Sequence, residues 1–203
     1  MSIQDRKQRE KEALRNKIIR AASELVSSEG HENVSIRKIA RAVEYSPRTI
    51  YLYFRDKEHL LQEVIEAGFE RTLSLRSRET PPDTLPPAKL LRRRLATHIY
   101  NALDHPNFYR AVVTLIFEKE YTPGPAQQKI IDQTGEDIAR CIAPEHKTTE
   151  EVENASRLVF ATVRGFTLSL LKINNSLSKE KRQQIIDHFL DFMIHGLQVQ
   201  EEK

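Results

Sequence analysis

The side chains best suited to bind a partner are gathered between Ser35 and Phe54. In this segment apolar residues recur at helical spacing, so the residues between them form a separate, outward face. A guanidinium group on that face can hydrogen-bond guanine edges or phosphate oxygens, hydroxyl groups can reach phosphate, and ring or apolar edges can contact thymine methyl groups. These residue types favour nucleic-acid binding, and the expected outward set is Arg48, Thr49, Tyr51, Leu52 and Tyr53.

The charge distribution points to the same part of the chain. The 203 residues carry a net charge of only +3, but residues 1–55 hold 12 basic and 7 acidic side chains, a net charge of +5. The excess positive charge therefore lies in the first quarter, where it attracts a polyanion. A basic tail over residues 1–12 is placed to reach the DNA backbone or minor groove, although a solvated face is the alternative. The cations of this stretch are Arg6, Lys7, Arg9, Lys11, Arg15 and Lys17.

Short helices must position these side chains. Ser35 is a good N-cap for one helix, and the pair Ser46-Pro47 starts the next, because proline at the first helical position leaves no N–H unsatisfied. Gly30 is expected to end the helix before them, and Asp56 to cap the helix after them. Three helices with a tight turn between the second and third form a helix-turn-helix. Its inward residues are predicted to be Ile36, Ile39, Ala40, Val43, Ile50 and Phe54.

The remainder of the chain is also predicted to be helical. Only six residues are glycine, and the sequence has no strand-like alternation of any length. Four prolines mark a linker over residues 77–87. The predicted fold class is therefore all-α, with about nine helices. The later helices are expected at 90–104, 108–121, 126–141, 149–174 and 179–199.

The composition also limits the compartment in which the protein works. No segment reaches the roughly 18 uncharged apolar residues that a membrane helix needs. The first 20 residues are charged and lack the apolar stretch of a signal peptide. Cys141 is the only cysteine, which excludes an intrachain disulfide and a multi-cysteine zinc site. We therefore expect a cytoplasmic protein with no membrane partner.

The helix-turn-helix segment resembles that of a known family, the TetR-type transcriptional regulators. The resemblance covers about 60 N-terminal residues, from an initial helix through SIRKIARAVEYSPRTIYLYF to RDKEHLL. Its most specific part is the set Thr49, Ile50, Tyr51, Tyr53, Phe54, Lys57, Glu58 and Leu60. The family implies a homodimer. Residues 1–56 would form the helix-turn-helix DNA-binding domain, with the motif at 35–54, and residues 57–203 a larger helical domain for effector binding and dimerisation.

The resemblance also implies roles for single residues. By position, Ser35, Arg37, Tyr51, Tyr53 and Lys57 correspond to phosphate contacts, and Ser46, Pro47, Arg48, Thr49 and Leu52 to residues that face the groove. One position departs from the family pattern, since Glu44 occupies the turn where the family usually has glycine. A left-handed conformation costs glutamate about 1 kcal/mol more than glycine, and the carboxylate adds negative charge near DNA.

The resemblance further implies a small-molecule effector in the C-terminal domain. Such pockets combine aromatic rings with a few polar groups, and the candidates are Thr114, Phe117, Phe160 and Arg164. Arg164 interrupts an apolar run, and a buried guanidinium must be paired. Its partner is either an acidic residue such as Glu118 or Asp137, or an anionic or carbonyl-bearing ligand. The chain also bears a weaker resemblance to a TetR subgroup that has a Trp-x-x-x-His-Gly element in its eighth helix. In this chain Phe160 and Arg164 stand at the positions of that Trp and His.

Two long apolar stripes near the C-terminus suggest how the chain dimerises. Two such helices from each protomer can close a four-helix bundle across a two-fold axis. The expected interface residues are Val159, Val163, Phe166, Leu170, Ile186, Phe189, Leu190, Met193 and Leu197.

Motifs for other functions are missing from the sequence. It has no Gly-x-Gly-x-x-Gly, Walker loop, Gly-x-Ser-x-Gly or Cys-x-x-Cys, so we expect no enzyme and no cofactor. His188, Asp191 and His195 share a helix face, but an exposed polar edge explains them better than a metal site does. The sequence thus predicts a ligand-responsive, operator-specific regulator, in the form of a repressor released by an inducer. The alternatives are a non-regulatory DNA-binding protein on the same fold, such as a chromosome or division factor, and a helical carrier or enzyme.

Overall fold

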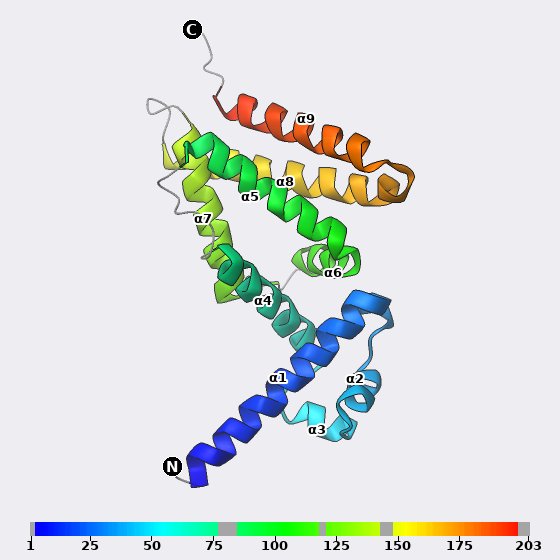
Figure 1. Cartoon of the computed structure of the whole chain (residues 1–203). Coiled ribbons are helices and arrows are strands. Elements are labelled where there is room, and N and C mark those ends of the chain that lie inside the picture. Colours follow the sequence, from blue (N-terminus) through cyan, green and yellow to red (C-terminus); the bar gives the residue numbers. More distant parts are fainter. Residues whose placement is uncertain (1–2, 77–84, 118–120, 143–147, 199–203) are drawn as a thin grey trace. The chain divides into compact units, whose positions relative to one another are not determined.

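The computed structural model describes residues 3–76, 85–117, 121–142 and 148–198, and within these ranges the regular structure is entirely helical (Figure 1). The all-α prediction is confirmed. Single 3-10 turns follow the first helix at His31–Asn33 and the eighth at Asn174–Ser176. The α-helices are α1 (Ile3–Glu29), α2 (Ile36–Val43), α3 (Pro47–Tyr51), α4 (Lys57–Arg76), α5 (Pro87–Asp104), α6 (Pro106–Ile116), α7 (Pro125–Cys141), α8 (Thr149–Ile173) and α9 (Lys179–Gln198).

Helix α1 begins earlier than the sequence suggested. Residues 3–12 are helical, so the basic stretch extends α1 and does not form a separate tail. Side chains one turn apart support this extension, because Arg6 pairs with Glu10 at 2.9 Å and Gln8 donates to Glu12 at 2.7 Å. The helix ends where expected, before Gly30, whose φ of 81° is a conformation that glycine adopts without strain.

The described helices form two compact units, each with its own core. The first unit holds α1, α2, α3, α4 as far as Leu73, α6 and the start of α7. The second holds the end of α4 from Ser74, α5, most of α7, α8 and α9. Packing therefore does not follow the predicted division after residue 56, which remains a prediction about function. None of the helices in the described ranges is long and apolar enough to cross a membrane.

The core of the first unit fixes the helix-turn-helix. All six predicted inward residues of that motif are buried, with Ile39, Val43 and Ile50 fully enclosed. They pack against Ile18 and Ala22 of α1. Helix α6 also belongs to this unit, and Asn107 at its start donates a 3.0 Å hydrogen bond to the carbonyl oxygen at residue 27 of α1.

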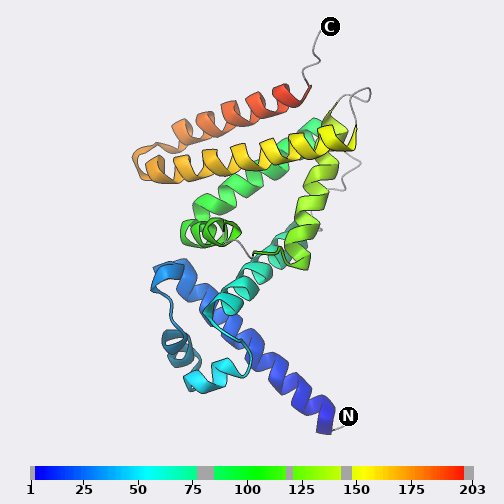
Figure 2. The same ribbon diagram turned by 180° about the vertical axis from the view of Figure 1, so that it is seen from behind.

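The second unit is built on α5, α8 and α9, which lie side by side in both ribbon views (Figures 1 and 2). Helix α8 starts with a capping box, in which Thr148 and Glu151 bond each other's backbone N–H groups. Arg92 of α5 joins Asp187 and Asp191 of α9 at 2.7 and 2.8 Å. The core beneath is formed by Leu91, Leu95, Ile99, Ile138, Val159, Val163, Leu170, Ile186 and Leu190.

Candidate nucleic-acid interface

The turn between α2 and α3 contains a left-handed residue. Glu44 has φ 63° and ψ 40°, and its N–H donates to the carbonyl oxygens of Ala40 and Arg41. It is the one non-glycine residue with positive φ among those described, so the strained position expected from the sequence is present. The ammonium group of Lys17 in α1 donates to the carbonyl oxygen of Val43 at 3.0 Å. This bond satisfies one of the last carbonyl groups of α2 and ties the turn to α1.

Helix α3 is short, and its caps follow the sequence. The Ser46 hydroxyl oxygen accepts a hydrogen bond from the N–H of Thr49 at 3.2 Å, and Pro47 opens the first turn. The hydroxyl groups of Ser46 and Thr49 lie 3.0 Å apart. Ile50 is fully buried and anchors the helix to the core of the first unit. The five residues of α3 are thus held at both the N-terminus and the buried face.

The opposite face of α3 is open. Arg48 is exposed, and Tyr51 and Leu52 keep 54% and 72% of their surface accessible. Large side chains that remain this exposed on an anchored helix are available to a partner. Of the five residues predicted to face outward, Arg48, Tyr51 and Leu52 are exposed, whereas Thr49 and Tyr53 are half-buried.

Two further helix N-termini belong to the first unit, and each has the cap that the sequence predicts. Ser35 accepts from the N–H of Lys38 at 3.3 Å, and Arg37 beside it is exposed. Asp56 accepts from the N–H of His59 at 2.7 Å. This backbone hydrogen bond, followed by the one from the Arg55 side chain, lowers the pKa of the Asp56 carboxyl. The ionised Asp56 carboxylate interacts favourably with the positive, N-terminal end of the α4 dipole.

Some cations of the basic stretch serve the fold. Arg15 pairs with Glu63 of α4 at 2.6 Å and lies over the ring of Phe54, 5.5 Å from its centroid. The ring of Phe54 also meets the imidazole of His59 edge to face, at 5.9 Å. Because these contacts join α1 to α4, Arg15 is a structural residue here, although the sequence placed it with the potential DNA contacts.

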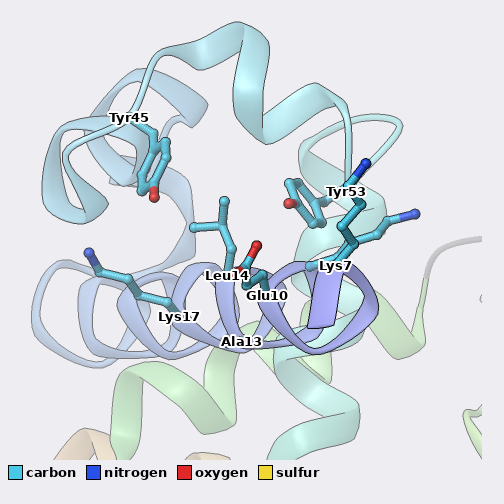
Figure 3. A pocket seen from close by; sticks show the side chains of 8 residues that line it. Lys7, Glu10, Ala13, Leu14, Lys17, Tyr45 and Tyr53 are labelled. Atoms are coloured by element: carbon cyan, nitrogen blue, oxygen red, sulfur yellow. The ribbon is translucent and has the colours of Figure 1, made fainter. Parts of the chain in front are cut away.

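A groove runs between α1 and the residues on either side of α3, with a volume of about 730 Å³ (Figure 3). Tyr45 lies across from Lys17, and Tyr53 across from Lys7. The Lys17 ammonium group is 5.7 Å from the centroid of the Tyr45 ring. Tyr45 was not among the predicted site residues, since only the fold brings it opposite α1. The groove is lined by Lys7, Glu10, Lys11, Ala13, Leu14, Lys17, Tyr45 and Tyr53.

The predicted DNA contacts all belong to the first unit, and most are accessible. Half-buried are Thr49, Tyr53 and Lys57, of which Tyr53 packs against the core. Exposed are Ser35, Arg37, Ser46, Pro47, Arg48, Tyr51 and Leu52.

The four predicted effector residues are divided between the units. Thr114 and Phe117 lie in the first unit, where both are exposed, and the Phe117 side chain keeps 71% of its surface. Phe160 and Arg164 lie in the second unit, one turn apart on α8, and are half-buried.

The two acidic partners considered for Arg164 have different outcomes. Asp137 forms an ion pair with Arg94 of α5, in which the side chains are 5% and 12% exposed. Burial raises the pKa of the Asp137 carboxyl, and the Arg94 charge acts in the opposite direction. Glu118 lies outside the described residues. Arg164 has an interaction of its own within the structure.

The apolar stripes of α8 and α9 lie largely inside the chain. Val159, Val163, Leu170, Ile186 and Leu190 are at most 3% exposed, because they pack into the core of the second unit. Such residues have no surface left for a partner. Phe166 and Phe189 stack on each other with centroids 3.8 Å apart and, like Met193 and Leu197, are half-buried. The exposed apolar side chains of these helices are others, namely Leu158 at 67%, Ile173 at 46% and Phe192 at 75%.

Among the described residues, no group of three or more His, Cys, Asp or Glu side chains is arranged to hold a metal ion. His188, Asp191 and His195 are exposed on α9, and Asp191 pairs with Arg92.

Comparison with known proteins agrees with this geometry. Residues 18–64 match the family described as bacterial regulatory proteins, tetR family. The regulator UidR of Escherichia coli strain K12 is 36% identical over 72 residues, which are 36% of this chain and 37% of UidR. The aligned region thus spans little more than a third of that relative.

The similarity to solved structures extends over nearly the whole chain. BioQ in complex with its double-stranded DNA operator has a TM-score of 0.70 at 19% identity, covering 92% of this chain and 98% of BioQ. A TetR variant from Acinetobacter baumannii AYE in complex with minocycline has a TM-score of 0.65 at 20% identity, covering 89% and 95%. At these identities the likeness shows the fold alone. Residues 18–64 thus carry a helix-turn-helix segment of the tetR family of bacterial regulatory proteins, within a fold that is similar to these structures over nearly the whole chain.

Proposed function

We propose that this chain is a DNA-binding transcriptional regulator, a homodimeric repressor that a small-molecule inducer releases from its operator. Residues 1–56 are the DNA-binding domain, and residues 57–203 bind the effector and form the dimer. The observation that carries the proposal is the exposed face of α3. It presents Arg48, Tyr51 and Leu52 while Ile50 anchors the helix to the core. UidR is named a transcriptional regulator, and BioQ was solved with its operator.

Direct reading of DNA falls to the residues of α3. Arg48 reaches base edges in the major groove, where a guanidinium matches the two acceptors of guanine. Leu52 and Tyr51 offer apolar and ring surface to thymine methyl groups or sugars. The N-terminus of α2, capped by Ser35, belongs to the same unit and can present backbone N–H groups to phosphate. Base contacts specify the sequence, and phosphate contacts fix the register.

The groove between α1 and α3 has the composition of a backbone contact. Three lysines and two tyrosines line it, against the single carboxylate of Glu10. Lysine is a compact cation that pairs with phosphate, and a tyrosine hydroxyl can donate to phosphate oxygen. Helical residues 3–12 bring Lys7 and Lys11 to this groove at fixed positions, which costs less entropy on binding than a flexible tail.

Dimerisation uses the exposed side of α8 and α9. Leu158 and Phe192 are large apolar residues that a single chain leaves in water, and a second copy would cover them. A two-fold axis lets the same patch serve both protomers. Two recognition helices then enter successive major grooves about 34–36 Å apart on a pseudo-palindromic operator.

Release by an effector requires two states of the dimer. A ligand that binds the state with the wrong helix separation more tightly lowers operator affinity, whatever its absolute affinity. The TetR variant solved with minocycline is an example of a related fold that holds a small molecule.

Selection of binding sites from random DNA tests the proposal directly. A regulator of this type should enrich one pseudo-palindromic sequence, and Arg48→Ala should lose the preference at one position of each half-site. Arg71→Ala, which removes an exposed arginine of α4, is the matched control and should enrich the wild-type sequence. Enrichment of no sequence would leave a non-sequence-specific DNA-binding protein, and absence of DNA binding would refute the proposal.

A further inference from the structure

We propose that Lys17 is a positioning residue for DNA recognition, which holds the turn of the helix-turn-helix in place and does not itself bind phosphate. This inference rests on the proposed function, because it gives different roles to the lysines of one DNA-binding groove. Lys7, Lys11 and Lys17 all lie on α1 and line that groove. Figure 3 shows Lys17 across from Tyr45, and Lys7 across from Tyr53 at a different place along the groove.

The end of α2 leaves a carbonyl group for a donor from another helix. The last four carbonyl groups of an α-helix have no partner within it. The two residues that follow α2 donate their N–H groups to the carbonyl oxygens of Ala40 and Arg41, at 2.9 and 3.2 Å. This pair of bonds is typical of a helix that ends on a left-handed residue. The carbonyl oxygen of Val43 lies outside the pair and accepts from the Lys17 ammonium group at 3.0 Å.

Two further attractions hold the Lys17 ammonium group at this place. The carboxyl end of a helix carries partial negative charge, which favours a cation. The Tyr45 ring lies beside the ammonium group, 5.7 Å from the ring centroid, within the range of roughly 6 Å for a cation–π contact. The next residue on α1, Ile18, is fully buried in the core and fixes the backbone beside Lys17. The ammonium group is therefore engaged by the protein itself.

The turn that Lys17 holds decides where α3 begins. Tyr45 directly precedes Ser46, which caps α3. Glu44 has a left-handed φ of 63°, which costs free energy for a residue with a side chain, so contacts from outside the turn help to maintain it. Arg48 lies in the first turn of α3, and a small change in the direction of so short a helix moves its guanidinium group relative to base edges. Base contacts specify the sequence, so Lys17 should affect sequence preference.

The affinity for operator divided by the affinity for scrambled DNA measures this effect. Lys17→Met removes the ammonium group and keeps an unbranched side chain of similar length. The affinity ratio should fall roughly 3- to 10-fold, as expected for the loss of one hydrogen bond that orients the reading helix. The slope of log affinity against log salt on scrambled DNA should equal that of wild type, because no phosphate contact is lost.

A lysine that binds phosphate would behave in the opposite way. Its loss would reduce the salt slope by about 1 and leave the affinity ratio unchanged, because phosphate contacts are made on every sequence. A general loss of folded protein would lower both affinities alike and also leave the ratio unchanged. A wild-type affinity ratio in Lys17→Met, or a reduced salt slope, would therefore overturn the inference.

Matched variants show what each part of the contact does. Lys11→Met removes an exposed lysine of the same groove and should reduce the salt slope by about 1 at an unchanged affinity ratio. Arg71→Met removes an exposed arginine of α4 and should change neither quantity. Tyr45→Phe keeps the ring and should keep the affinity ratio, whereas Tyr45→Leu removes the ring and should lower it. Equal affinity ratios in the two Tyr45 variants would overturn the role of the ring.

Amide hydrogen exchange of the DNA-free chain tests the same contact without an operator. In Lys17→Met the N–H groups of Glu44 and Tyr45, which close the turn, should exchange roughly 3- to 10-fold faster, because the turn opens more often. The N–H of Leu60, which donates to the carbonyl oxygen of Asp56 at the start of α4, should exchange as in wild type. Unchanged exchange in the turn, or equal acceleration at Leu60, would overturn the inference.

The outcomes for this inference and for the proposed function are distinct. Lys17 is exposed on α1, so Lys17→Met should fold. If it does not, Lys17→Gln, which shortens the side chain and removes the charge, takes its place with the same expected results. Operator binding by the Lys17 variant at the wild-type affinity ratio would reject this inference alone. A wild-type chain that binds no DNA would reject the proposed function.

Discussion

The ring of Phe108 on α6 fills the space that a side chain would need at Gly68 on α4. A Cβ atom added to Gly68 would lie 2.4 Å from the Cζ atom of that ring, which is closer than real Cβ contacts come. Both residues belong to the first unit. The missing side chain therefore sets how closely α6 packs against α4, in the unit that carries the helix-turn-helix.

Gly68→Ala should lower the free energy of unfolding, by up to about 2 kcal/mol. Overpacking costs about 1–3 kcal/mol, which exceeds the gain of about 1 kcal/mol for alanine over glycine in a helix. Urea unfolding measures the difference. Gly135→Ala on α7 meets only an ordinary contact at 3.8 Å and should raise stability. If Gly68→Ala stabilised the chain as Gly135→Ala does, the close packing of Phe108 would be disproved.

The helix-turn-helix could be predicted because its signals are local. The side chains of Ser35, Ser46 and Asp56 each cap a helix by accepting a hydrogen bond from the backbone N–H group three residues later. A short stretch of sequence therefore contains both partners. The membership of α6 in the first unit could not be predicted, since it depends on packing between residues such as Gly68 and Phe108, 40 positions apart. Tyr45 and Lys17 are likewise brought to one groove by the fold.

The dimer prediction illustrates a different limit. Periodicity identified the apolar stripes of α8 and α9, but a stripe has the same spacing whether a partner or the chain itself covers it. Ile186 and Leu190 are fully buried within one chain, so α5 and α8 cover them. Phe192 lies outside the predicted stripe, and only the accessible surface in the folded chain reveals it as a candidate contact.

Glu44→Gly should raise the free energy of unfolding by up to about 1 kcal/mol, because glycine adopts the left-handed conformation at φ 63° without strain. Glu44→Ala retains the strain and should give no such gain. Denaturant unfolding of the two variants separates strain from charge. Both variants remove a carboxylate near DNA, so both should bind operator slightly more tightly at low salt. Equal stabilities of the two variants would show that the turn is not strained.

Arg48→Ala and Lys57→Ala should weaken operator binding in different ways. Loss of Arg48 should cost about 1–3 kcal/mol on the operator and relax the preference at one position. Loss of Lys57 should weaken binding on all sequences and reduce the slope of log affinity against log salt by about 1. Fluorescence anisotropy with specific and scrambled DNA at several salt concentrations measures both effects. A salt-independent affinity for the wild-type chain would contradict the interface.

Phe192→Glu should convert the proposed dimer to a monomer and abolish cooperative operator binding. The Phe192 side chain is 75% exposed in the single chain, so its replacement leaves the fold intact while placing a charge in the proposed interface. Phe117→Glu changes a phenylalanine that is 71% exposed directly after α6, and this variant should remain dimeric. Sedimentation at micromolar concentration distinguishes the two states. A Phe192→Glu variant that sediments like wild type would place the interface elsewhere.

The stability of the chain should fall as the pH decreases from about 6.5 toward 4, in part because of His98. The folded-state pKa of His98 is lowered to about 4 from the ordinary 6.5, first by burial and then by Arg76 and Arg164. Between these values the unfolded chain binds a proton at this residue and the folded chain does not, so the free energy of unfolding rises with pH. The contribution of His98 to the free energy of unfolding is complete above the unfolded pKa and is lost as the pH falls from 6.5 toward 4.

Urea unfolding of wild type and His98→Gln at pH 7.5 and pH 5 isolates the contribution of His98. The carboxyl groups whose pKa values are lowered, such as Asp56 and Asp187, contribute equally to both chains. His98→Gln should lose less stability than wild type on acidification. Identical losses in the two chains would mean that the pKa of His98 is not lowered in the folded chain.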